Sequence, residues 1–275
     1  MASQSFSAFS SEDIKFNHIR CAYGEHDYRS HSHDVCELLF LLKGDMLYMV
    51  EGKVYHLPRY SLVISRPSSL HSIKSDGPTE YERYNIIFDE KKIGGQFFEK
   101  IPQDIDVVNF QGNELVCNLL RKFDYYSENF QQDTLKKLLE NLTEEILCNV
   151  FLSSRDSVQS SICSSNPIVN QALSYIHENI TSSLTIESIC EELYITKSHL
   201  HHLFINHLEI TPKKYILSRK LLLARRELRS GSKPTDVCLN YGFCDYSTFY
   251  RHYKQYFGHT PSEEIHNKIV REILS

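Results

Sequence analysis

The sequence predicts a multidomain α+β protein: an N-terminal antiparallel β-barrel followed by two helices, and a C-terminal all-α domain with two helix-turn-helix units. Three observations predict this division. Short apolar runs separated by tight turns dominate the first hundred residues, a serine-rich segment interrupts the chain past its middle, and a motif then repeats about 49 residues apart. A chain of 275 residues is long enough for two domains that each bury a core.

The N-terminal part carries the strand signals. Three of its segments are short and apolar and are separated by turns that contain glycine or proline: 37–42, 46–50 and 61–64. Short strands joined by tight turns are typical of an antiparallel sandwich or barrel. We therefore expect a barrel in the first part of a domain that spans residues 1–152.

The hydrophobic period changes to that of helices between about residues 113 and 152. On the second of these helices four apolar residues lie at i, i+4, i+7 and i+11: Leu135, Leu139, Leu142 and Ile146. Two interpretations of this stripe stay open. It either packs the helix against the barrel or forms the seam of a homodimer.

Residues 153–165 separate the two predicted domains. Seven of these thirteen residues are serine, a composition typical of a flexible linker. The net charge is −7 over residues 1–165 and +2 over residues 166–275. The whole-chain charge of −5 argues against a DNA partner, but the positive C-terminal part permits one.

A repeat with a period of 48 or 49 residues occupies the C-terminal domain, residues 166–275. Each copy has the hydrophobic spacing of two helices joined by a short turn. This predicts helix-turn-helix units at about residues 185–207 and 234–257, with a long basic helix between them. The matching pairs are Leu200-x3-Phe204 with Phe249-x3-Tyr253, Thr211-Pro212 with Thr260-Pro261, Ile189-Cys190 with Val237-Cys238, and Ile216 with Ile265.

Two such units at a fixed separation suit double-stranded DNA. A helix fits the major groove, and side chains near its N-terminus reach base edges there. A rigid linking helix would hold the two helices about 34 Å apart, in successive segments of the groove. The side chains that we expect to contact DNA are Lys197, Ser198, His201, His202, Tyr246, Ser247, Thr248, Tyr250, Arg251 and Lys254.

The motifs of this part resemble those of the AraC/XylS family of transcription regulators. The resemblance covers about 100 residues, roughly 168–267, and implies a seven-helix domain with two helix-turn-helix units. It places Ser198, His201 and His202 in the first recognition helix, and Tyr246, Ser247 and Arg251 in the second. The residues that carry it include Leu200-His201-His202-Leu203-Phe204, Thr211-Pro212-x2-Tyr215-Ile216, Gly242-Phe243-Cys244-Asp245-Tyr246-Ser247-Thr248-Phe249 and Phe257-Gly258-His259-Thr260-Pro261.

Three positions depart from the family pattern. Glu209 replaces a usual glycine, so we expect the last turn of the first unit to be strained or rebuilt. Cys238 replaces a usual alanine, and Pro234 stands at a usually aliphatic position. None of the three removes a residue that we expect to contact DNA.

A second constellation lies in the N-terminal part: His31-x-His33-x3-Glu37-x6-Gly44, followed by His71. Alternate residues of a strand face one side, so these side chains can converge inside a barrel. The set suits a divalent transition metal, and its spacing resembles the first motif of cupins. Three interpretations stay open: a metal-free effector pocket, a divalent metal site, and purely structural polar roles.

These features predict a sequence-specific, DNA-binding transcriptional regulator with a cupin-like N-terminal domain for effector binding and dimerisation. We expect the effector to be a small molecule bound in the barrel. The family resemblance favours an activator, which implies RNA polymerase as a further partner beside DNA and a second copy of the chain. The alternative is a cupin-type metalloenzyme with an accessory helical domain.

We expect no enzyme activity and no required cofactor. The sequence contains no P-loop and no G-x-S-x-G nucleophile motif. A signal peptide and a long apolar run are also absent, so a cytoplasmic protein without membrane contact is expected.

Overall fold

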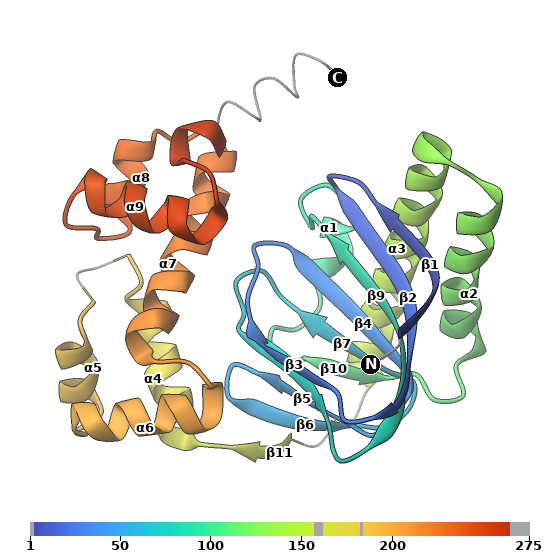
Figure 1. Ribbon diagram of the computed structural model, residues 1–275, viewed down its shortest axis with the longest axis horizontal. Coiled ribbons are helices and arrows are strands. Elements are labelled where there is room, and N and C mark those ends of the chain that lie inside the picture. The colour runs from blue at the N-terminus through green and yellow to red at the C-terminus, as the bar shows by residue number, and fades with distance from the viewer. Residues whose placement is uncertain (1–2, 157–161, 182–183, 265–275) are drawn as a thin grey trace. The chain divides into compact units, whose positions relative to one another are not determined.

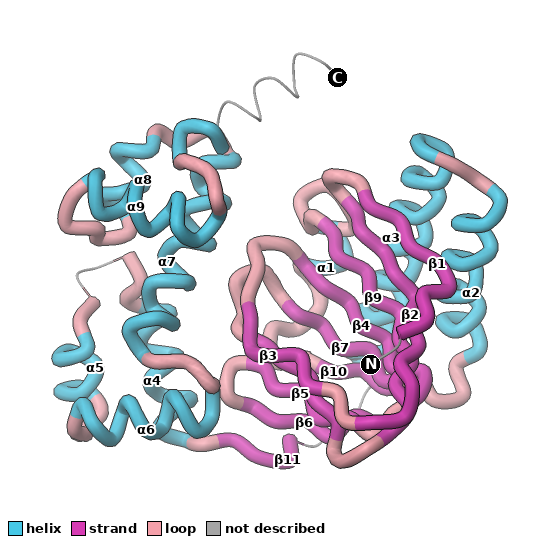
Figure 2. Tube along the Cα trace, viewed as in Figure 1, coloured by secondary structure: helices cyan, strands magenta, loops and turns pink. Residues whose placement is uncertain are grey.

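Two antiparallel sheets and two long helices build the N-terminal part of the chain (Figures 1 and 2). The computed structural model describes residues 3–156, 162–181 and 184–264. The chain forms two compact units: the N-terminal unit, residues 1–31 and 35–164, and the C-terminal unit, residues 165–275 with the short segment 32–34. The expected fold class, a sheet-rich domain and a helical domain, is confirmed.

Most pairs in the two sheets join strands that are not consecutive in the sequence. The six-stranded sheet has the order β1 (Ser3–Ser10), β2 (Ile14–Gly24), β9 (Thr79–Phe88), β4 (Cys36–Lys43), β7 (Ser61–Ser65) and β10 (Val107–Asn109). The five-stranded sheet has the order β11 (Ile162–Ser165), β6 (Lys53–Leu57), β5 (Met46–Val50), β8 (His71–Ser75) and β3 (Asp27–His31).

Strand β4 shows why the segment 37–42 is apolar without alternation. Leu38 and Phe40 belong to a core that the six-stranded sheet shares with helices, whereas Leu39 and Leu41 belong to a second core between the sheets. Successive side chains of a strand point to opposite faces. Both faces of β4 are buried from Leu38 to Leu41, and both of these sets are apolar; Glu37, also buried in β4, is a charged exception.

Helices α2 (Glu114–Asn129) and α3 (Gln132–Asp156) cover the outer face of the six-stranded sheet, beside the short α1 (Gly95–Phe98) (Figure 1). The stripe on α3 corrects the expected dimer seam. Its four members are buried in the core of the unit, each no more than 5% exposed: Leu135, Leu139, Leu142 and Ile146. The packing interpretation is therefore right, because side chains already covered by the same chain cannot form a seam.

Regular structure extends into both ends of the serine-rich segment 153–165. Helix α3 continues to Asp156, and β11 begins at Ile162. The intervening residues 157–161 lie outside the described part of the chain.

The C-terminal unit contains six helices within its described residues. They are α4 (Pro167–Glu178), α5 (Ile186–Glu192), α6 (Lys197–Leu208), α7 (Pro212–Arg229), α8 (Pro234–Asn240) and α9 (Tyr246–Phe257). The seventh helix implied by the family resemblance, and the repeat residue Ile265, fall at or beyond the end of the described range. Among the helices that are described, none is both long and apolar enough to span a membrane.

Side-chain caps fix where the helices of the repeat begin. The hydroxyls of Thr185, Thr196 and Thr211 accept the backbone N–H three residues on, at the starts of α5, α6 and α7. The Asp245 carboxylate does the same for α9. Helix α8 begins instead at Pro234, whose fixed φ suits a first helical position.

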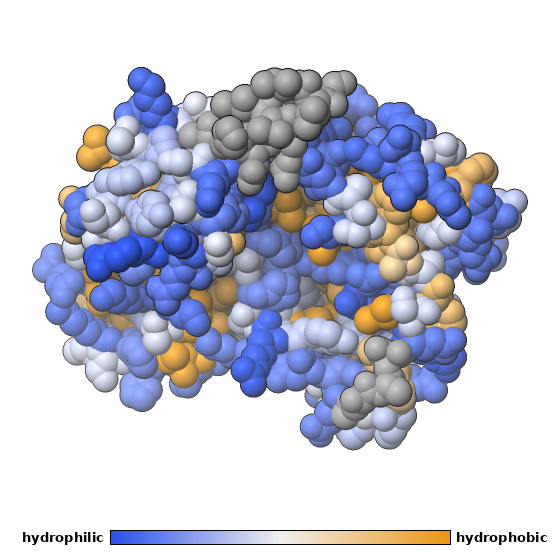
Figure 3. All heavy atoms as spheres, turned by 45° about the horizontal axis from the view of Figure 1, so that its top comes forward, coloured by the Kyte–Doolittle hydropathy of each residue, from blue (hydrophilic) through white to orange (hydrophobic). Residues whose placement is uncertain are grey.

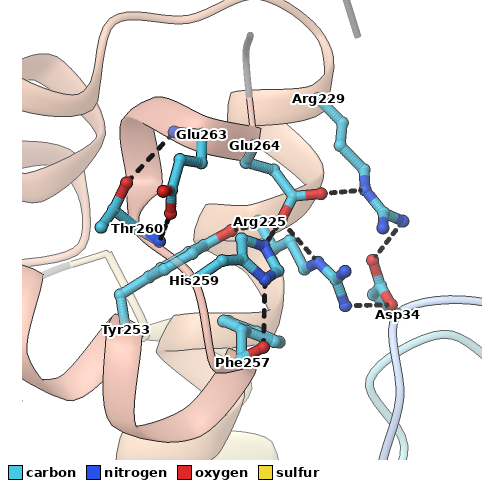
Figure 4. Close-up of polar contacts among 9 residues, drawn as sticks. All are labelled: Asp34, Arg225, Arg229, Tyr253, Phe257, His259, Thr260, Glu263 and Glu264. Carbon is cyan, nitrogen blue, oxygen red and sulfur yellow. Dashed lines mark hydrogen bonds and ion pairs between the residues drawn. The ribbon is translucent and has the colours of Figure 1, made fainter. Parts of the chain in front are cut away.

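A buried carboxylate joins the end of the described chain to α7 and α9 (Figure 4). Glu264 is 7% exposed, and its oxygens accept hydrogen bonds from Arg225 Nε at 3.0 Å, Arg229 Nε at 2.7 Å and the Tyr253 hydroxyl at 2.9 Å. The His259 ring contacts the same carboxylate. This network holds the second half of the C-terminal unit together.

Candidate nucleic-acid interface and effector site

The second helix of each helix-turn-helix unit presents the predicted DNA-contacting side chains at the surface. Eight of them are exposed: Lys197, Ser198, His201 and His202 on α6, and Tyr246, Ser247, Arg251 and Lys254 on α9. Thr248 and Tyr250 are half-buried. The opposite faces hold the fully buried pairs Leu200 with Phe204 and Phe249 with Tyr253. Each helix thus packs against its unit through one face and exposes the other face to solvent.

On α6 the exposed face begins at the first turn. Ser198, His201 and His202 lie at i, i+3 and i+4, so they share one face, and the two imidazole rings are 6.4 Å apart, edge to face. The Lys197 ammonium forms an ion pair with Glu187 of α5 at the surface. Exposed pairs of this kind are weak, so Lys197 can exchange this carboxylate for a phosphate.

On α9 a chain of hydrogen bonds orients the arginine. The Asp245 carboxylate accepts from the Thr248 backbone N–H at 2.7 Å and from its hydroxyl at 2.8 Å. Hydrogen bonds from the Thr248 backbone and hydroxyl hold the pKa of Asp245 below its usual range. The Arg251 guanidinium donates to the Thr248 hydroxyl at 3.3 Å, which steadies a planar donor fork suited to guanine or phosphate.

The 49-residue repeat also identifies a residue that the sequence prediction missed. Ser198 and His202 correspond to Ser247 and Arg251, and Ile205 corresponds to Lys254. Ile205 is 39% exposed on the outer face of α6. An apolar side chain there can contact a thymine methyl group; carrying the repeat through to the last turn would have found it.

Within the C-terminal unit, helix α7 links the two helix-turn-helix units. Its 18 residues correspond to a length of about 27 Å. On the face drawn in Figure 3, hydrophilic side chains predominate over the helices of the C-terminal unit, with small separate apolar patches between them.

The structure brings together the four residues of the N-terminal constellation. His31 ends β3, His33 lies in the loop that follows, Glu37 is in β4, and His71 begins β8. One ligand atom from each lies within 4.8 Å of the others. Glu37 and His71 are buried, His33 is half-buried and His31 is exposed, so the group opens toward solvent at one side.

Both ring nitrogens of His71 face oxygen acceptors. Nδ1 lies 3.1 Å from the Ser69 carbonyl oxygen, and Nε2 lies 3.2 Å from Glu37 Oε2. A neutral imidazole has one N–H and can satisfy only one of them. The contact between His71 and Glu37 therefore needs a further proton or a cation between the two side chains.

The donor set fits a divalent transition metal. His31 Nδ1 and His71 Nδ1 each lie near a backbone carbonyl, at 3.0 and 3.1 Å, the outer contact that orients metal-binding histidines. A tetrahedral ion with bonds of about 2.0–2.1 Å holds its ligand atoms about 3.4 Å apart. Small movements of flexible side chains would therefore bring the four ligand atoms close enough to bind one ion.

Another group of possible ligands was not predicted from the sequence. Asp45, His56 and Asp76 come from separate turns and strands, and His56 Nε2 lies 2.6 Å from Asp45 Oδ1. All three are exposed. Their wide sequence separation offered no spacing signal, and solvated acidic groups of this kind are common.

Two domain families match the chain. The AraC-like ligand binding domain matches residues 16–97, and the helix-turn-helix domain matches residues 189–266. These ranges cover most of the sheets, most of the first helix-turn-helix unit and all of the second.

Several curated proteins are similar in sequence. The XylDLEGF operon transcriptional activator of Pseudomonas putida is 29% identical over 133 residues, which are 47% of this chain and 38% of that protein. The HTH-type transcriptional activator RhaS of Escherichia coli O139:H28 is 21% identical over 246 residues, 86% of this chain and 87% of RhaS. The matched part therefore spans well under half of the first relative and most of the second.

Solved structures also align with most of the chain, including the two that follow. ToxT from Vibrio cholerae O395 aligns over 93% of this chain and 98% of its own, with 14% identity and a TM-score of 0.39. The AraC-like transcriptional activator CuxR aligns over 79% of both chains, with 16% identity and a TM-score of 0.42.

Proposed function

Because this chain belongs to the AraC/XylS family of transcriptional regulators, we propose that it is a sequence-specific DNA-binding regulator that activates transcription in response to a small molecule. One observation carries the proposal. The C-terminal unit contains both helix-turn-helix units, and the second helix of each exposes hydrogen-bonding side chains from its first turn onward.

The exposed residues divide by chemistry into two groups. Lys197 and Lys254 are flexible point charges suited to phosphates, whereas Arg251 offers the planar fork that recognises guanine. His201 and His202 can donate to bases or phosphates. Phosphate contacts set position and base contacts set sequence preference, so this set can do both.

The N-terminal unit is the proposed sensor. His31, His33, Glu37 and His71 would line its effector pocket without a metal, with Glu37 and His71 as an ion pair. Effector binding changes the DNA affinity only if the effector prefers one arrangement of the protein, a coupling typically worth about 1–3 kcal/mol. The active form is proposed to be a homodimer that contacts RNA polymerase and dimerises through a surface other than the buried stripe of α3.

A second candidate for the sensor is a divalent transition metal at the same four residues. The contacts of His71 favour it, since both of its ring nitrogens face oxygens. A bound ion would supply charge that holds the loop after β3 against β8. His31, His33 and His71 would bind through ring nitrogens and Glu37 through its carboxylate.

Binding of the purified full chain to fragmented genomic DNA, followed by sequencing of the bound fragments, tests the proposed function. We expect a motif of two blocks about 10 base pairs apart, one for each recognition helix. Ser198→Glu and Ser247→Glu place a negative charge on α6 and α9, respectively, and each should remove one block. Lys122→Ala, an exposed change on α2, is the control that should leave both. A folded protein that enriches no motif would refute the proposal.

A further inference from the structure

Three side chains of strand β9 point into the space between the two sheets. Tyr81, Arg83 and Asn85 alternate along the strand and so share one face. Tyr81 belongs to the core between the sheets, which identifies this face as the inner one. Tyr81 and Asn85 are 0% and 6% exposed, and Arg83 is half-buried.

Each of the three carries a buried polar atom without a hydrogen-bond partner. The atoms are the Tyr81 hydroxyl oxygen, Arg83 Nε and Asn85 Oδ1, three of the six such atoms in the described residues. Roughly 90% or more of buried polar atoms in native proteins are paired. Three unpaired atoms on one face of one strand therefore mark a place where a bound molecule can complete them.

Other buried tyrosines of this unit are paired. The Tyr84 hydroxyl, on the outer face of β9, donates to Asp124 at 2.6 Å. Tyr48, which is as deeply buried between the sheets as Tyr81, has its hydroxyl 2.9 Å from Ser65 Oγ. Among the buried tyrosines in the described part of this unit, only Tyr81 has a hydroxyl without a partner.

Arg83 brings a positive charge to this face. Its Nη1 donates to Asn17 Oδ1 at 3.1 Å, and Asn17 is the register partner of Asn85 on β2. The guanidinium carbon lies 5.8 and 5.9 Å from the ring centres of Tyr28 and Tyr81. Within the described residues no carboxylate forms an ion pair with Arg83, so its charge is available to an anion.

The available hydrogen-bonding roles define the ligand class. Arg83 Nε–H can only donate, Asn85 Oδ1 can only accept, and the Tyr81 hydroxyl can do either. Burial raises the pKa of Tyr81 far above its ordinary value, so this hydroxyl stays protonated. A carboxylate accepts from the first and the third, and a hydroxyl or amino group beside it donates to the second.

We propose that the effector of this regulator is a small organic acid bearing a hydroxyl or amino group next to its carboxylate, bound by Arg83, Tyr81 and Asn85 on the inner face of β9. This assignment rests on the proposed sensor function of the barrel. It adds these three residues to the histidine group as lining of the proposed effector pocket, and it specifies the ligand as an anion.

Stability without any ligand gives the first test. Tyr81→Phe removes an unpaired hydroxyl, so the melting temperature of the full chain should stay the same or rise. Tyr48→Phe is the matched control: its hydroxyl is paired and equally buried, so its loss should lower the melting temperature. An equal fall in both variants would show that the Tyr81 hydroxyl has a structural partner and would overturn the proposal.

Ligand binding gives the second test. Lactate and 2-hydroxyhexanoate at millimolar concentration should raise the melting temperature of the full chain, whereas the corresponding uncharged amides should not. Arg83→Gln and Tyr81→Phe should each weaken binding of the acids, by about tenfold or more for the arginine. No shift with either acid, or equal shifts with acids and amides, would overturn the assignment.

DNA binding of the same variants separates this inference from the proposed function. Arg83→Gln and Tyr81→Phe should still enrich the DNA motif, because both lie in the N-terminal unit. If the wild-type chain binds the acids but enriches no motif, the regulator function fails and the anion site stands. If it enriches the motif but ignores the acids, only the anion site fails.

Discussion

Glu209 and Gly258 end equivalent helices of the two repeats, 49 residues apart, and both have a left-handed backbone, with φ of 58° and 80°. Glycine adopts this conformation freely, whereas a residue with a Cβ is strained by roughly 1 kcal/mol or more. Of the two alternatives expected at Glu209, strain or a rebuilt turn, the structure shows strain. The helix ends as in the second repeat, with a non-glycine residue in the left-handed conformation. The turns inside the two helix-turn-helix units show the same pairing of a non-glycine residue with a glycine. Tyr194 and Gly242 are both left-handed, with φ of 54° and 63°.

We predict that Glu209→Gly stabilises the C-terminal unit. Relief of the backbone strain should exceed the added entropy of the unfolded chain, for a net gain of about 0.5–1 kcal/mol in the free energy of unfolding. Denaturant unfolding of the full chain measures it. Gly258→Ala is the matched control, since the space beside that glycine is open, and it should cost about 1–2 kcal/mol from backbone strain alone. A loss of stability in Glu209→Gly would contradict the interpretation.

The repeat could be predicted from the sequence because local patterns determine it. The spacing of Leu200 and Phe204, and of their counterparts, follows the 3.6-residue helical period, which also fixes which neighbours are exposed. Threonine and aspartate caps mark where the helices start, and they too depend only on residues nearby in the sequence. For these reasons the exposed faces of α6 and α9 carry the predicted residues.

The environment of an apolar stripe could not be predicted in the same way. The pattern of Leu135 to Ile146 shows that one helix face is covered, but not whether the same chain or a second copy covers it. The inner face of β9 was missed for a related reason. Tyr81, Arg83 and Asn85 are ordinary strand residues in the sequence, and only tertiary packing decides that their polar atoms have no partners.

The buried stripe leads to a second prediction. Leu139 is 0% exposed in the core of the N-terminal unit, so Leu139→Ala should lower the free energy of unfolding by about 2–5 kcal/mol. Leu152→Ala, on the same helix but 50% exposed, should change it by less than about 0.5 kcal/mol. Thermal unfolding and sedimentation of both variants check this. A change in oligomeric state without loss of stability in Leu139→Ala would instead support a homodimer seam at this stripe.

Acid should destabilise the C-terminal unit through Glu264. Burial would raise the pKa of this carboxyl, but the hydrogen bonds of His259 and Arg229 and the charge of Arg225 outweigh burial and lower it from 4.5 to about 2. Stability from a lowered pKa is fully present above the unfolded value and is lost as the pH falls through the folded one. We therefore expect a loss on the order of 2–3 kcal/mol between about pH 4.5 and pH 2.

Glu264→Gln tests the source of this acid sensitivity. The amide cannot titrate, so the stability of the variant should depend less on pH over that window. Its stability at neutral pH should be lower, because Arg225 and Arg229 each lose one ion-pair partner. Glu263→Gln is the neighbouring control, since Glu263 is exposed and its hydrogen-bond partner is the exposed Thr260 cap rather than an arginine. An unchanged pH profile in Glu264→Gln would assign the sensitivity to other groups.

Arg251 and Lys254 should affect DNA binding differently. If Arg251 recognises a base, Arg251→Ala should cost about 1–3 kcal/mol in binding and relax the preference at one position. Lys254→Ala should weaken binding to all sequences about equally and reduce the slope of log affinity against log salt by about one unit. Fluorescence anisotropy with matched and mutated DNA over a salt series measures both effects. Unchanged specificity in Arg251→Ala would place that guanidinium on a phosphate.

Metal removal distinguishes the two candidates for the histidine group. In the metal-free proposal, Glu37 and His71 satisfy each other as an ion pair, so dialysis against a chelator should leave the melting temperature and DNA affinity unchanged. Elemental analysis after loading with zinc should then find well under one ion per chain. The His31→Gln, His33→Gln double variant provides the control, because it removes two ligands and leaves the buried pair intact. One ion per chain in the wild type and none in the double variant would establish the metal site instead.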